Sequence, residues 1–146
     1  MQGLDEYTRM GLRALLSSLL CLAARAHVRA GRKRAGMELL ARAEAHMRDS
    51  EERWHEAELH RLRGTIVGSR DPRTAEAHFR QAIDVARAQG AKLWELRATV
   101  DLAALWRREG KQDAARRLLH PVLSSFADDV DAVDLRTARD LYARLA

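Results

Sequence analysis

Residues 71–90, DPRTAEAHFRQAIDVARAQG, contain a complete helix together with its start and stop signals. Asp71 is a favoured N-cap residue, and Pro72 follows at the first helical position, where no helical hydrogen bond needs its missing amide hydrogen. Phe79 and the apolar residues after it recur at intervals of three or four, which places them on one helix face. Gly90 then ends the helix. The stretch therefore predicts one amphipathic helix.

The same kinds of signal divide the rest of the chain into six further helices. Gly31 and Gly110 end two of them as Gly90 ends the first, and Pro121 predicts a kink or break near His120. Short connections between helices of similar length predict antiparallel neighbours. We expect three helix hairpins and a closing helix, at about residues 5–48, 51–89, 93–127 and 131–145.

The composition agrees with a single all-α domain that spans residues 1–146. Of the 146 residues, 47% are hydrophobic and 32% are charged, which is typical of a globular protein and not of a disordered one. Two prolines and eight glycines supply too few turns for a sandwich or barrel of many strands. Strong helix formers dominate instead.

A repeat becomes visible when Gly31, Arg70 and Gly110 are aligned, which gives a period of 39 to 40 residues. Under this register, large and small residues recur at equivalent positions of the three hairpins. The equivalent sets include Leu20, Leu59 and Thr99; Ala23, Leu62 and Leu102; Gly36, Ala75 and Ala115; and Leu40, Phe79 and Leu119. Alternating small and large contacts allow two helices to pack closely, so the hairpins are expected to stack in tandem.

The order of large and small positions resembles that of tetratricopeptide repeats, although the usual period there is 34 residues. The longer period is similar to repeats at the C-terminal end of bacterial regulators. Those regulators join a STAND-type ATPase module to a nucleotide-cyclase or DNA-binding domain. The strings that carry the closer resemblance are ERWHEAELHRLRG (52–64), AEAHFRQA (75–82), WELRA (94–98) and LLHPV (118–122), with the Asp134-Leu135 start of the last helix.

The resemblance implies a right-handed solenoid of about seven helices with a role in bacterial signalling or transcriptional regulation. It implies a scaffold that binds a segment of a partner protein on its concave face, and it carries no catalytic residue over to this chain. The cyclase, ATPase and DNA-binding parts have no counterpart here. The chain is therefore either a freestanding relative or a fragment of a larger multidomain regulator.

The charge balance raises the alternative of nucleic-acid binding. The chain has 26 basic and 21 acidic residues, which gives a net charge of +5. Most of its arginines alternate with acids along helical faces, whereas a phosphate-binding surface needs a basic block or stripe, so we rank this alternative last. The single cysteine, Cys21, suits a reducing compartment, and the apolar run around it is too short to span a bilayer. We expect a cytoplasmic protein without membrane contact.

Motifs for catalysis or metal binding are incomplete in this sequence. A zinc-protease helix needs two histidines four residues apart, but His55 and His60 are five apart and lie about 140° apart around a helix. The acidic run at 128–131 lacks the glycine and glutamate of an EF-hand loop, and there is no glycine-rich phosphate loop. We expect no enzymatic activity, no metal and no cofactor.

The first helix of each stacked hairpin lines the concave face of a solenoid. The residues expected to point into that groove are Cys21, Arg25, Arg29, Ala57, His60, Gly64, Arg97, Val100 and Arg108. This set contains four arginines and no acid, which favours an acidic peptide or a C-terminal carboxylate as the ligand. The alternative is that arginine, as the commonest polar residue here, falls on every face.

The helix at about 5–30 has an unusually rich apolar face, and as the first element it has no preceding repeat to cover it. Leu12, Leu15, Leu16, Leu19, Leu20 and Leu22 lie in it. Because a terminal repeat normally presents a polar outer side, this face predicts a homodimer through the first helix, or packing against another domain of a longer chain. A structural or oligomerisation role is thus the second hypothesis.

Overall fold

The computed structural model describes residues 2–127 and 132–146, with side chains from residue 15 onward, and these residues form seven α-helices and no strand. The helices are α1 (Gln2–Arg29), α2 (Lys33–Ser50), α3 (Glu56–Val67), α4 (Pro72–Ala88), α5 (Lys92–Arg108), α6 (Gln112–Ser124) and α7 (Val133–Ala143). The prediction of an all-α chain with about seven helices is confirmed. In the described part, no helix is both long and apolar enough to cross a membrane.

Local sequence signals end and start the helices at four predicted places. Gly31, Gly90 and Gly110 have φ angles of 75°, 65° and 77°, a left-handed conformation that residues with a Cβ rarely adopt. The Asp71 carboxylate accepts a hydrogen bond from the backbone amide of Thr74 at 3.1 Å, which caps α4.

Two boundaries differ from the prediction. The helix expected to begin at about residue 51 begins at Glu56, because Glu51 takes a left-handed conformation with φ of 56° that ends α2. Pro121 does not break α6, which continues to Ser124. Pro121 lies exposed in the last turn, so the one helical hydrogen bond that its missing amide hydrogen removes is near the end of the helix, and only three residues of α6 follow it.

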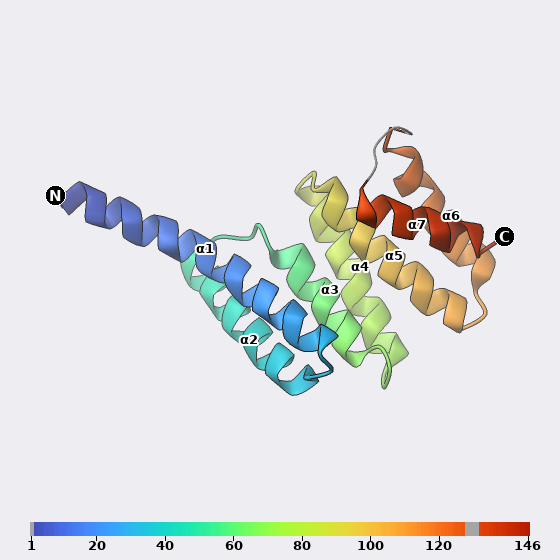
Figure 1. Ribbon diagram of the computed structural model, residues 1–146, viewed down its shortest axis with the longest axis horizontal. Coiled ribbons are helices and arrows are strands. Elements are labelled where there is room, and N and C mark those ends of the chain that lie inside the picture. The colour runs from blue at the N-terminus through green and yellow to red at the C-terminus, as the bar shows by residue number, and fades with distance from the viewer. Residues whose placement is uncertain (1, 128–131) are drawn as a thin grey trace.

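The helices pack in a regular order along the chain (Figure 1). Each odd-numbered helix packs along the even-numbered helix that follows it, and α4 also packs along α5. The odd-numbered helices contact one another in sequence, α1 with α3, α3 with α5 and α5 with α7. Within the described residues, α2, α4 and α6 make no such contact with one another. The odd-numbered helices therefore share one surface of the molecule.

Among the residues whose side chains are described, three apolar clusters form the core. One joins α1, α2 and α3, the next joins α4 to α5, and the last joins α5, α6 and α7. Leu40, Phe79 and Leu119, which the repeat register aligns, lie one in each cluster with exposed fractions of 0%, 3% and 0%. Burial of these side chains supplies the main force that holds the hairpins together.

A glycine allows α3 and α4 to approach closely. A Cβ atom on Gly64 would lie 2.6 Å from Cε1 of Phe79, closer than side-chain carbons pack. Because Gly64 has no side chain, the Phe79 ring can lie against the α3 backbone. This contact fixes how α3 is rotated about its own axis.

Candidate functional site

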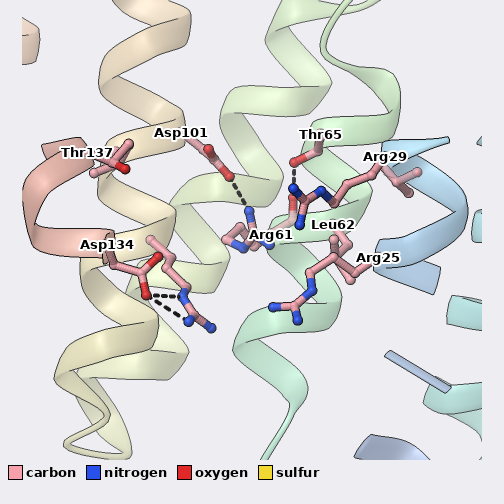
Figure 2. A pocket seen from close by; sticks show the side chains of 11 residues that line it. Arg25, Arg29, Arg61, Leu62, Thr65, Asp101, Asp134 and Thr137 are labelled. Atoms are coloured by element: carbon pink, nitrogen blue, oxygen red, sulfur yellow. Dashed lines mark hydrogen bonds and ion pairs between the residues drawn. The ribbon is translucent and has the colours of Figure 1, made fainter. Parts of the chain in front are cut away.

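A cavity of about 340 Å³ opens on the surface that the odd-numbered helices share (Figure 2). It is lined by residues of α1, α3, α5 and α7, and we call it the groove. Its charged lining consists of four arginines and two aspartates, namely Arg25, Arg29, Arg61, Arg97, Asp101 and Asp134. Val28 and Val100, both partly buried, add apolar surface.

Arg61 is the centre of an ion-pair network that links α3 to α5. Its Nε and Nη2 donate to the two carboxylate oxygens of Glu58 at 2.7 and 2.8 Å, and its Nη1 donates to Asp101 at 2.6 Å. Glu58 is only 3% exposed. Burial raises the pKa of the Asp101 carboxyl above its usual range, against the opposing effect of the Arg61 guanidinium. These contacts leave Arg61 fully engaged within the fold.

Arg97 is also held by the fold, at the contact between α5 and α7. Its Nε and Nη2 donate to Oδ2 of Asp134 at 3.0 and 2.7 Å. The guanidinium lies 5.0 Å from the centre of the Trp94 ring, where a cation–π contact adds to the attraction. Arg97 is thus neutralised by Asp134 and held in place beside Trp94.

The two arginines of α1 are in a different situation. Among the described side chains, neither Arg25 nor Arg29 forms a hydrogen bond or an ion pair. Arg25 is partly buried, and Figure 2 shows its guanidinium pointing from α1 across the groove toward α5 and α7. Arg29 is exposed at the edge of the groove. The α1 side of the groove therefore carries the uncompensated positive charge.

The structure brings Arg25, Arg29, Arg97 and Val100 together as lining residues of the groove. Arg108 lies beside them in an adjoining cavity that shares Asp101 with the groove. Cys21, by contrast, is 2% exposed and belongs to the first core cluster, so its thiol does not face a ligand. Burial raises the pKa of the Cys21 thiol to about 12, with a smaller effect from the charge of Glu58.

On α3, the residues that line the groove lie about one position further along than those predicted, and Gly64 lines the adjoining cavity that also contains Arg108. The His60 ring stacks on His78 of α4, with 6.1 Å between ring centres, and Gly64 faces Phe79. The side chains that line the groove from α3 include Arg61 instead. A glycine in the interior of a helix was the signal in the sequence that could have located the face toward α4.

The two histidines of the HEAELH segment are separated in space. Nδ1 of His55 lies 3.2 Å from the Ser18 hydroxyl oxygen, and its ring packs edge-on against Trp94. His60 is 7% exposed, and burial lowers its pKa to about 4. In the described part of the chain, no group of three or more His, Cys, Asp or Glu side chains is arranged to hold a metal ion. The acidic run at 128–131 lies outside the described residues.

No family model, no curated protein and no solved structure matches this chain. Its function must therefore be inferred from its own geometry. That geometry offers a ligand two guanidinium groups that have no partner among the described side chains, at the α1 side of the groove, with Val28 and Val100 nearby.

Proposed function

We propose that this chain is a non-catalytic helical-repeat protein that binds an extended acidic segment of a partner protein in the groove. The observation that carries the proposal is the contrast between the arginines. Arg61 and Arg97 are paired with acids, while Arg25 and Arg29 have no partner among the described residues. A guanidinium binds a carboxylate with two parallel hydrogen bonds, which makes a free arginine in a groove a suitable anchor.

The order of helix contacts supports a tetratricopeptide-like solenoid as the scaffold. The first helix of each hairpin and α7 share one surface, and the second helices contact only sequence neighbours. In solenoids of this kind the shared surface is concave and receives extended peptides. The resemblance to repeats of STAND-type regulators favours a cytoplasmic role in bacterial signalling or transcriptional control, either as a free module or within a longer regulator.

The distribution of charge in the groove predicts the orientation in which the acidic segment binds. Near α5 and α7, Asp101 and Asp134 neutralise the arginines and would repel a further acid. A carboxylate is therefore best placed beside Arg25, at the α1 side. Val28 and Val100, which are only partly buried, then lie beside the following part of the segment, where they favour apolar side chains.

Fluorescence anisotropy can test the groove with a labelled ten-residue peptide that is rich in glutamate and ends in a free carboxylate. At about 50 mM salt, where screening is modest, we expect Arg25→Glu to weaken binding at least about tenfold, since a charge-assisted hydrogen bond is lost and a repulsion is gained. Arg42→Glu, at an exposed position of α2 outside the groove, is the matched control. Equal binding by the two variants, or no binding by the wild type, would rule out this acidic-ligand site.

A further inference from the structure

One side of α1 is apolar and uncovered. Leu15, Leu16, Leu19 and Leu22 have exposed fractions of 56%, 39%, 58% and 53%. The opposite side of the same helix is also apolar, and there Leu20, Cys21 and Ala24 are buried in the core. A helix that belongs only to its own hairpin would need just one of these two faces.

The repeat register shows what normally covers this side. Leu19, Glu58 and Ala98 occupy equivalent positions of the three hairpins, but their exposed fractions are 58%, 3% and 0%. Ala98 lies in the apolar cluster that joins α5 to α4 of the preceding hairpin, and Glu58 lies close enough to Cys21 of α1 for its charge to affect that thiol. Among the described residues, α1 has no such neighbour, so its side of the contact is open.

The uncovered face has the spacing of a coiled coil. Positions 12, 15, 19, 22 and 26 alternate steps of three and four, with leucine at the first four and alanine at the last. That alternation forms a straight seam when two helices pair. The 28 residues of α1 also extend well beyond the 18 of α2, as Figure 1 shows. A helical segment that no other element supports is marginal in water.

We propose that α1 pairs with α1 of a second copy of this chain, and that the two helices form an antiparallel coiled coil in a homodimer. The two-fold axis passes near residue 17, so that Leu15 meets Leu19 of the second copy and position 12 meets position 22. Leu16 lies beside the axis, close to its own counterpart. Each contact then occurs twice, and the assembly closes at two chains.

Charge selects the antiparallel orientation. Arg29 occupies the next position of the seam after Ala26. A parallel pair would place Arg29 against Arg29 of the second copy, whereas the antiparallel pair places it opposite position 5, which is aspartate. Since the core residues of α1 lie on the side away from the seam, the second copy can approach without displacing α2.

Sedimentation equilibrium at about 100 µM tests the homodimer. We expect twice the 16.5 kDa mass of the chain for the wild type, and the single mass for Leu15→Glu, Leu19→Glu and Leu22→Glu combined. These side chains are exposed, so the variant should keep its helical circular dichroism. Leu93→Glu, at an exposed leucine of α5, is the control and should remain a dimer. A monomeric wild type, a triple variant that still dimerises, or an open-ended assembly would each overturn the proposal.

Cysteine cross-linking tests the orientation. In the antiparallel pair, position 8 lies opposite position 26 of the second copy, while the two copies of position 26 are about 27 Å apart along the seam. We expect a mixture of Thr8→Cys and Ala26→Cys chains to form a disulfide-linked pair upon oxidation, and neither variant alone to do so. The buried Cys21 should stay unreactive. Cross-linking of Ala26→Cys with itself would show a parallel pair and refute the arrangement.

Arg29 belongs both to the groove and to the end of the seam, but the variants that test the two proposals change other residues: Arg25 lies outside the seam, and the three leucines do not line the groove. Loss of peptide binding in Arg25→Glu with an intact dimer would separate the two proposals. The same separation follows if the leucine variant is monomeric and still binds the acidic peptide.

Discussion

Substituting alanine for Gly64 should destabilise the protein, although alanine is the better helix former. Gly64 lies in the interior of α3, where replacing glycine by alanine normally stabilises by about 1 kcal/mol. Here the new Cβ would lie 2.6, 2.8 and 3.0 Å from three ring carbons of Phe79. Those atoms belong to an aromatic side chain that is 3% exposed and cannot swing into solvent.

The two effects can be compared in size. Overpacking of a filled core costs about 1–3 kcal/mol, and the three short contacts place this site toward the upper end. After the helix-propensity gain is subtracted, we expect Gly64→Ala to lower the free energy of unfolding by about 1–2 kcal/mol. For a chain of this length, that corresponds to a melting temperature lower by roughly 3–6 °C.

Urea unfolding followed by circular dichroism measures this difference directly. Phe79→Leu is the partner variant, because a smaller side chain gives the new Cβ room. We expect the double variant to be no less stable than Phe79→Leu alone, with a coupling energy of about 1–2 kcal/mol. If Gly64→Ala were as stable as the wild type, the close approach of α3 to α4, and the rotation of α3 that depends on it, would be wrong.

Three further predictions concern stability and pH. Arg61→Met leaves two acids without their partner and should lower the free energy of unfolding by about 3 kcal/mol in urea titrations, whereas Arg80→Met, which breaks an exposed pair, should change it by less than about 1 kcal/mol. The fold lowers the pKa of His60 to about 4, so the unfolded chain binds a proton at this residue more readily than the folded chain does. The contribution of His60 to the free energy of unfolding is therefore complete above pH 6.5, and about 3 kcal/mol is lost as the pH falls toward 4. His60→Leu should make urea midpoints measured across that range less dependent on pH. Leu40→Ala at a fully buried position should cost about 3 kcal/mol, while Leu19→Ala should leave the unfolding of the monomer nearly unchanged; similar costs for the two would contradict their assigned burial.

Helix ends could be predicted from the sequence wherever a single residue type determines the backbone conformation. Gly31 and Gly110 adopt left-handed angles that few other residues tolerate, and Asp71 caps the helix that it was expected to cap. It was insufficient at Glu51, which adopts the same left-handed region without being a typical turn residue. The loop after Glu51 is fixed from a distance, since the side-chain amide of Gln89 donates to the Arg53 carbonyl at 2.7 Å.

The candidate site was predictable only where its residues act independently of distant partners. Arg25 needs no more than its place on α1 to reach the groove. Arg61 lies among alternating charges that are typical of a solvated helix face, and its burial depends on Asp101, forty positions further along. Arg97 likewise loses its free charge to Asp134, which the fold brings from the last helix. Such ion pairs join residues of different helices and depend on the tertiary structure, so helical spacing alone does not reveal them.

The junction between α2 and α3 has a consequence for how the native protein opens. The packing of α2 along α3 is much less extensive than that of α4 along α5, and the connection through residues 51–55 contains no helix. In a chain whose units contact only their neighbours, the most weakly attached unit opens first. Amide hydrogens of α2 should therefore exchange with deuterium before those of α4 and α5. Because the groove spans this junction, with Arg25 on one side and Asp101 on the other, a bound ligand would slow that exchange by joining the two units.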